Sequence, residues 1–346
     1  MATPGEVVWL DPGRNSTQLE CPRDIHSMGR TMTKPTPLLE STKSSMRLLT
    51  DLFDFVWPAA AGMWNMRWQV SGFMGAHGNA TESDLHSRFI LGSGIRGTNL
   101  RRTCIETTWN EQQEHFARIL LFNIFALYEL WADAACRELG AAASKDLVKN
   151  LQYPSATVKG KAQGISAALI KLDDGNCLPL QSELAPIAAA AESVHVDCLD
   201  ELLCVYRLFK ELRNSITHRG GCVDAKIVDA HAAVVAMPRP LPFRAPKIDL
   251  PVVGSPIQVT LYEMVALTDL VRRTMLSIDA RLWEGCSAKR LLLKRWKAFH
   301  GRRTFLPASR EKRTKRLRGA FVKIGAPRPD AIVQLERMLS EESLIF

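Results

Sequence analysis

Apolar residues recur at helical spacing along most of this chain, and the clearest case is the stretch Val196–Leu212. Its apolar positions follow the i, i+3, i+4, i+7 spacing of an amphipathic helix. Longer stretches at 110–139 and 260–283 carry the same period and indicate core helices. We therefore predict a mainly α-helical fold. The apolar face of the first stretch consists of Leu199, Leu202, Val205, Tyr206, Phe209 and Leu212.

The N-terminal hundred residues are less regular. Residues 1 to about 40 are rich in Pro, Thr, Ser and Gly and indicate a loosely packed arm. Ser44–Trp57 has helical spacing, and Pro58 is expected to end that helix because proline lacks a backbone N–H. Residues 66–74 are compatible with a short strand.

The remainder of the chain divides at its proline-rich and basic stretches. Gly140 is expected to end the long helix, and a second helical stretch is predicted at 155–172. Pro238–Pro256 cannot be helical and is expected to be extended. We predict three parts: an N-terminal arm with a small mixed extension at 1–100, a helical bundle at 101–285, and a basic helical segment at 286–346.

Composition and cysteine usage exclude several classes of protein. Apolar residues make up 46% of the chain and charged residues 23%, which are globular values. Ile119–Cys136 is nearest to a membrane span, but it contains Asn123, Glu129 and Asp133, so we expect a buried helix and no membrane partner. The first residues lack a basic region followed by an apolar run, so no secretory signal is expected. Eight cysteines without a C-x-x-C pair fit the reducing cytoplasm, and neither metal nor cofactor is predicted.

The positive charge is concentrated near the C-terminus. Residues 288–323 contain 14 Lys and Arg and one acid, whereas the whole chain has a net charge of +9, so the rest is slightly acidic. Such a segment indicates a polyanion partner, most simply RNA. A solvated helix is the alternative, and a membrane surface is a weaker one. The predicted RNA-binding residues are Lys289, Arg290, Lys294, Arg295, Arg302, Arg303, Arg313, Lys315 and Arg316.

Side chains able to do chemistry follow the amphipathic stretch directly, in the sequence ELRNSITHRGG at 211–221. Arg213 is a permanent cation whose planar fork matches phosphate oxygens, and His218 can exchange a proton near neutral pH. Asn214 lies four residues before His218, so on a helix the two share a face and the amide can orient the imidazole. A cation, a proton carrier and an orienting amide suffice for RNA cleavage without metal.

The spacing of Arg and His is not specific by itself, because it occurs twice. Arg295 and His300 repeat it inside the basic segment, without the Asn. We interpret this second pair as a coincidence or a phosphate contact, and it serves as an internal control.

With its leading amphipathic helix, the Asn after the Arg and the Gly-Gly break, the stretch R213-N214-S215-I216-T217-H218 resembles the signature of the HEPN superfamily of helical-bundle ribonucleases. The resemblance covers about residues 110–285. It implies a HEPN-like bundle and a metal-independent endoribonuclease, commonly a homodimer in which the motifs of both protomers meet in one cleft. Such proteins often act as toxins or defence effectors.

The resemblance also implies roles for individual residues. His218 would be general acid and base, Arg213 would stabilise charge in the transition state, Asn214 would orient, and Arg219 would add a phosphate contact. The family often has an acidic or polar residue on an earlier helix facing the motif, and Glu129 is the candidate here; a half-exposed helical Glu is the alternative. Other functions remain open: a catalytically silent nucleic-acid-binding or adaptor module, or a ribonuclease gated by an antitoxin or sensor protein.

Two further features favour structural roles. Gly92–Gly97 matches G-x-G-x-x-G, but no clear strand precedes it, so we interpret it as a loop. The eight tryptophans, Trp57, Trp64 and Trp68 in particular, are expected to anchor the core, because the Lys- and Arg-rich run that a base-stacking surface would need lies about 230 residues further along the chain.

Overall fold

Helices account for 66% of the computed structural model and strands for 4%, which confirms the mainly α-helical prediction. The structure describes residues 35–140, 144–247, 249, 252–301 and 303–346. The elements in chain order are α1 (Glu40–Ala76), α2 (Glu82–Phe89), the π-helix η1 (Arg102–Glu106), α3 (Trp109–Glu138), α4 (Lys145–Asn150), β1 (Ala156–Val158), β2 (Lys161–Gln163), α5 (Ile165–Asp173), α6 (Leu178–Glu183), α7 (Ala185–Ala189), the 3₁₀ helix η2 (Val196–Cys198), α8 (Leu199–His218), α9 (Ala225–Val235), α10 (Leu261–Leu282), α11 (Cys286–His300), α12 (Arg310–Lys323) and α13 (Val333–Glu341).

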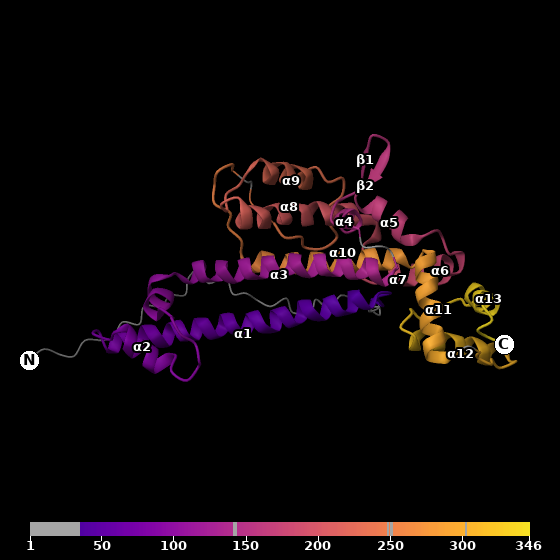
Figure 1. Ribbon diagram of the computed structural model, residues 1–346, viewed down its shortest axis with the longest axis horizontal. Helices are drawn as coiled ribbons and strands as arrows, with labels where there is room; N and C mark the ends of the chain where they lie inside the picture. Colours follow the sequence, from indigo (N-terminus) through magenta and orange to yellow (C-terminus); the bar gives the residue numbers. More distant parts are fainter. Residues whose placement is uncertain (1–34, 141–143, 248, 250–251, 302) are drawn as a thin grey trace, which may run out of the picture. The chain divides into compact units, whose positions relative to one another are not determined.

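The core is built from four long helices and their neighbours. Helix α3 packs against both α1 and α10, and α10 also packs against α8, which carries α9 on its other side (Figure 1). Fully buried aromatic side chains fill the space between α3 and α8, where Phe125 and Tyr128 contact the ring of Tyr206. The periodicity of α3, α8 and α10 therefore predicted the core helices correctly.

The start of α1 is held by two acids from distant helices. The buried carboxylate of Asp279 on α10 accepts the backbone N–H groups of Leu38 and Leu39 at 2.5 and 2.9 Å. Glu138, at the end of α3, accepts those of Glu40 and Ser41 at 2.9 and 3.0 Å. These carboxylates satisfy backbone N–H groups at a helix start that have no intrahelical partner.

Helix α1 contradicts the prediction that Pro58 ends it. It runs unbroken to Ala76, and residues 66–74, expected as a strand, belong to it. Pro58 and Asp54 are both exposed, so water can solvate the carbonyl of Asp54 that proline leaves without its usual donor. Tertiary packing of α1 on α3 then outweighs the local cost.

Residues 155–172 also differ from the predicted helix. They form the antiparallel hairpin β1–β2, with Val158 opposite Lys161, and then α5. The two-residue loop has positive φ at Lys159 (50°) and Gly160 (74°), which is the backbone of a tight hairpin turn. Gly140, in contrast, follows the end of α3 with φ of 75°, as predicted.

The predicted division at residues 100 and 285 does not coincide with a break in packing. The described residues, from 35 onward, cluster as one compact unit. In this unit α11 packs against α5, and α13 packs against α6. The carboxylate of Glu183 on α6 accepts the N–H groups of Gln334 and Leu335 at the start of α13, which fixes the C-terminal helices to the body. The predicted N-terminal arm lies outside the described residues except for 35–40.

Candidate functional site

The motif residues occupy the last two turns of α8. Arg213 is half-buried and donates from Nη1 to Oδ1 of Asn214 at 3.2 Å, and its buried Nε has no hydrogen-bond partner among the described residues. His218 is the last residue of the helix and is exposed. The site thus combines a partly desolvated guanidinium with an imidazole that a substrate can reach.

Helical geometry decides which of these side chains share a face. At about 100° per residue, Asn214 and His218 are about 40° apart around the helix axis, whereas Arg213 and His218 are about 140° apart. The predicted pairing of Asn214 with His218 on one face follows from the continuous helix over 213–218. The bond to Asn214 draws the Arg213 guanidinium toward that face. Helix α8 therefore contributes a single imidazole, that of His218, to the site.

The chain reverses immediately after His218. Gly220 and Gly221 have φ values of 80° and 72°, a conformation that other residues rarely adopt. The N–H of Gly221 donates to the carbonyl of Ser215 at 3.1 Å, and the Ser215 hydroxyl donates to the carbonyl of Cys222 at 2.6 Å. Residues 221–223 then pair with 254–257 through backbone bonds of 2.9 Å. The Gly-Gly sequence is therefore a requirement of the turn that holds the end of α8.

Arg219, predicted as a phosphate contact, is already bound to two carboxylates. Its guanidinium lies 3.1 Å from Oε2 of Glu211 and 3.0 Å from Oδ2 of Asp224. Glu211 is buried and also pairs with Arg207, whose guanidinium lies 4.2 Å from the centre of the Tyr153 ring. Asp224 additionally caps α9 by accepting the N–H of Ile227. This network balances the charge of Arg219 within the fold and ties α8 to α9.

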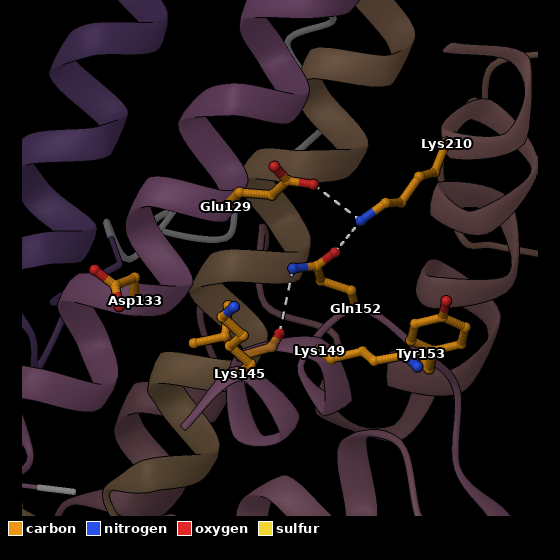
Figure 2. Close-up of a pocket in the computed structure, with 8 residues that line it drawn as sticks. Glu129, Asp133, Lys145, Lys149, Gln152, Tyr153 and Lys210 are labelled. Atoms are coloured by element: carbon orange, nitrogen blue, oxygen red, sulfur yellow. Dashed lines mark hydrogen bonds and ion pairs between the residues drawn. The ribbon is translucent and has the colours of Figure 1, made fainter. Parts of the chain in front are cut away.

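Glu129 faces α8 one turn before the motif. Its Oε1 lies 2.9 Å from Nζ of Lys210, which also donates to the side-chain oxygen of Gln152 (Figure 2). These residues line an open cavity of about 420 Å³ together with Lys145 and Lys149 of α4. Among the described residues, no hydrogen bond or ion pair joins Glu129 to Arg213, Asn214 or His218. Sequence reasoning missed Lys210, although its position three residues before Arg213 was a signal for it.

Tyr206 lies on α8 and packs against Tyr128 of α3. Its hydroxyl is buried and has no hydrogen-bond partner among the described residues. Burial raises the pKa of Tyr206 well above its usual value, and the nearby Tyr128 and Glu129 raise this pKa further. The positive charges of Arg207 and Arg213 act in the opposite direction on the same pKa. The charges of Glu129 and Arg213 therefore act on one buried group, although the two side chains do not contact each other.

The predicted RNA-binding residues of the basic segment fall into two groups. In the first group, acids from elsewhere in the fold neutralise the cations. Lys289 lies 2.7 Å from Glu342 and Arg290 lies 2.6 Å from Asp174. The other two members pair likewise: Arg295 with Glu138 at 3.6 Å and with Glu40 at 3.5 Å, and Arg313 with Glu336 at 2.5 Å.

The second group is exposed. Lys294, Arg303, Lys315 and Arg316 form no ion pair within the described part of the chain, and Arg303 lies over the ring of Phe346 at 5.3 Å. Arg302 lies outside the described residues. No described contact joins the basic segment to His218: its contacts include α5, α6, the start of α1 and the end of α3.

Only some of the tryptophans that were expected in the core are buried. Trp131, Trp283 and Trp296 are fully buried, but Trp57, Trp64 and Trp68 on α1 are 38–54% exposed. The continuation of α1 through Pro58 places these three indoles on one flank of that helix, beside the face packed on α3. The G-x-G-x-x-G stretch forms a loop after α2, as predicted.

Three comparisons with known proteins complete the description. No family model, no curated protein and no solved structure matches this chain. Helix α3 is long and apolar enough to cross a membrane, but half of its most apolar window is buried inside the protein. Within the described residues, no group of three or more His, Cys, Asp or Glu side chains could hold a metal ion.

Proposed function

We propose that this chain is a metal-independent endoribonuclease of the HEPN type that acts in the cytoplasm as a toxin or defence effector. In this proposal the 2′-oxygen of the RNA attacks the adjacent phosphorus and the 5′-oxygen leaves. The products are a 2′,3′-cyclic phosphate and a 5′-hydroxyl. The observation that carries the proposal is that the exposed imidazole of His218 and the half-buried guanidinium of Arg213 lie on the last two turns of one helix, whose end is held by the Gly-Gly turn.

Each side chain has a role that its surroundings support. His218 takes the proton of the 2′-hydroxyl or gives one to the leaving oxygen, because its imidazole is accessible and imidazole is the side chain that most often acts as a general acid or base. Arg213 stabilises charge on the phosphoryl oxygens, more effectively because it is partly desolvated. Asn214 holds the Arg213 guanidinium and shares a helix face with His218, whose imidazole it would orient. Glu129 acts indirectly: it holds the ammonium group of Lys210, which lies on α8 three residues before Arg213.

The chemistry is tested by cleavage of labelled cellular RNA with the purified full-length protein. We expect 2′,3′-cyclic phosphate and 5′-hydroxyl ends, and unchanged cleavage in EDTA because the proposed steps use side chains alone. Products with 3′-hydroxyl ends, or cleavage that requires Mg²⁺, would contradict this mechanism. RNA binding without any cleavage would favour the alternative of a silent binding or adaptor module, and cleavage that needs an added protein would favour a gated enzyme.

The proposal includes a homodimer in which two motifs share one cleft. One α8 supplies one imidazole, whereas the reaction needs a base and an acid. Light scattering of the purified protein at micromolar concentration should give twice the mass of the 38.6 kDa chain. A monomer that retains full cleavage would contradict the shared cleft.

A further inference from the structure

The cations of α11 and α12 differ in how the fold uses them. On α11, three of the five Lys and Arg residues pair with carboxylates of other elements. On α12, only Arg313 of the seven does so within the described residues. Most cations of α11 are thus neutralised by ion pairs within the fold, whereas most cations of α12 are not.

A hollow beside α12 collects several of these uncompensated cations. It has a volume of about 620 Å³ and is lined by Arg310, Lys315, Arg318 and Arg328 together with Thr314 and a single acid, Glu311. Arg310, Thr314 and Arg318 follow one another at i, i+4 and i+8, so they form one stripe about 12 Å long. Four cations against one acid give the hollow a strong positive potential.

The fourth cation comes from a different segment, which makes the hollow a concave site and not only a helix face. Arg328 is exposed and stands between Pro327 and Pro329, both of which are buried. Proline fixes its own φ, so the backbone that presents Arg328 is restricted. Arg318 donates to the carbonyl of Asp330 just beyond, which ties α12 to this turn. The fold therefore fixes the Arg318 side chain and the backbone that carries Arg328.

The chemistry of the lining favours a nucleic-acid backbone over a membrane surface. Amphipathic membrane helices insert apolar side chains on the side next to their basic residues. The apolar residues of α12, Leu317, Ala320 and Phe321, face inward and are buried, and Val322 is its one large apolar side chain that is exposed. Phosphodiesters need only spaced cations, and a stripe of about 12 Å is long enough to face more than one phosphate of a strand.

We propose that the hollow lined by Arg310, Lys315, Arg318 and Arg328 is the docking site for the phosphate backbone of RNA. The identity of the polyanion rests on the proposed function, but the docking does not depend on catalysis by His218. The site includes Arg318 and Arg328, and it leaves the paired residues Lys289, Arg290 and Arg295 with structural roles.

The test measures RNA binding in the full-length His218→Ala protein, so that cleavage does not interfere. Fluorescence anisotropy with a labelled uridine homopolymer, over a range of salt concentrations, gives the affinity and its salt slope. The triple variant Arg310→Gln, Lys315→Gln, Arg328→Gln changes only exposed residues. We expect at least tenfold weaker binding at low salt and a slope reduced by about 2, because each lost single-strand phosphate contact removes about 0.7. Arg328→Ala alone should reduce the slope by about 0.7.

The matched control removes three cations that form ion pairs elsewhere: Lys43→Gln, Arg137→Gln and Arg290→Gln. It should leave the salt slope unchanged. An equal loss of slope in both triple variants would show an effect of overall charge and overturn the site. The site is also overturned if the parent protein does not bind the RNA, or if the α12 variant loses binding only to vesicles containing phosphatidylserine. Failure of cleavage with normal RNA binding would overturn the proposed function and leave this site standing.

Discussion

Two helices of this protein end in the same arrangement of side chains, and the fold treats them differently. Helices α8 and α11 each carry an Arg followed five residues later by a His that closes the helix, with a positive-φ glycine soon after. In α11, Arg295 donates to the carbonyl of Leu38 and lies near Glu40 and Glu138. The ring of His300 packs on Trp296, and its Nε2 lies 3.3 Å from the carbonyl of Ala320.

In α8 the corresponding residues have few partners. The guanidinium of Arg213 bonds only to its neighbour Asn214 within the described residues, and the imidazole of His218 is exposed. The acids near this helix end are paired with other arginines: Glu211 with Arg207 and Arg219, and Asp224 with Arg219. Spacing alone is therefore a poor guide to function, and the supply of carboxylates around each pair distinguishes a structural pair from one that remains available to a substrate.

The sharpest test of this difference is to remove each histidine. His218→Ala should lower the rate of RNA cleavage by about 10²- to 10⁴-fold, the usual contribution of a positioned general acid or base. His300→Ala should leave the chemical step nearly unchanged, because its ring already packs within the fold. Single-turnover cleavage of a labelled RNA measures both rates. Equal losses in the two variants would remove the distinction between the helices.

The two arginines should separate activity from stability. Arg213→Ala should slow cleavage by a factor comparable to that of His218→Ala, and the double variant should lose far less than the product of the two factors, because both act on one step. Arg295→Ala should instead reduce the free energy of unfolding by about 1–2 kcal/mol, since it leaves Glu138 and the Leu38 carbonyl short of a donor. Urea denaturation and single-turnover rates on both variants make the comparison. A stable Arg295→Ala protein would show that its ion pairs contribute nothing.

The segment that Arg295 contacts is also held by a buried acid, which gives a dependence on pH. Burial raises the pKa of Asp279 to about 6, against about 3.9 in an unfolded chain, although the N–H groups of Leu39 and Leu38 oppose the rise. The folded state therefore binds the proton more tightly, and this group lowers stability as pH increases from about 4 to 6. Between pH 4.5 and 7.5 the loss should be about 2 kcal/mol.

Asp279→Asn isolates this contribution, since an amide mimics the protonated acid. The difference in unfolding free energy between the two proteins should shift by about 2 kcal/mol in favour of the variant as pH rises. Asp173, whose pKa burial also raises to about 6, is present in both proteins and cancels in the difference. A difference that does not change with pH would mean that Asp279 stays ionised throughout this range.

The apolar periodicity predicted the helices that build the core, but it did not predict the continuation of α1 through Pro58 or the hairpin at 156–163. The helices α3, α8 and α10 were predictable because their apolar faces are continuous. The prediction at Pro58 was wrong because the energetic cost of a proline inside a helix depends on whether the carbonyl that loses its donor, here that of Asp54, reaches water. The exposure of that carbonyl is set by tertiary packing and cannot be read from the sequence. The short hairpin at 156–163 carried one weak signal, Lys159–Gly160, within a stretch that also fits a helix.

The candidate site was predictable in its residues but not in their surroundings. The order of Arg213, Asn214 and His218 places them on one helix end once the helix is known. The partners of Arg219 and Glu129 come from tertiary packing: Asp224 approaches after the Gly-Gly turn, and Lys210 meets Glu129 across two helices. No spacing in the sequence specifies which cations of the basic segment the acids of the fold will neutralise.

The hydrogen bonds from the start of α1 to the carboxylate of Asp279 also have a consequence for the order in which a newly synthesised chain folds. Asp279 lies 241 residues after Leu38, whose N–H group it accepts. At synthesis rates of about 5–20 residues per second, Leu38 is made about 12–50 seconds before its partner. Helix α1 can form early and pair with α3, but the docking of its first turn waits for α10. The docking of the first turn of α1 is thus a late event in the folding of each new molecule, because it needs a residue made long after α1 itself.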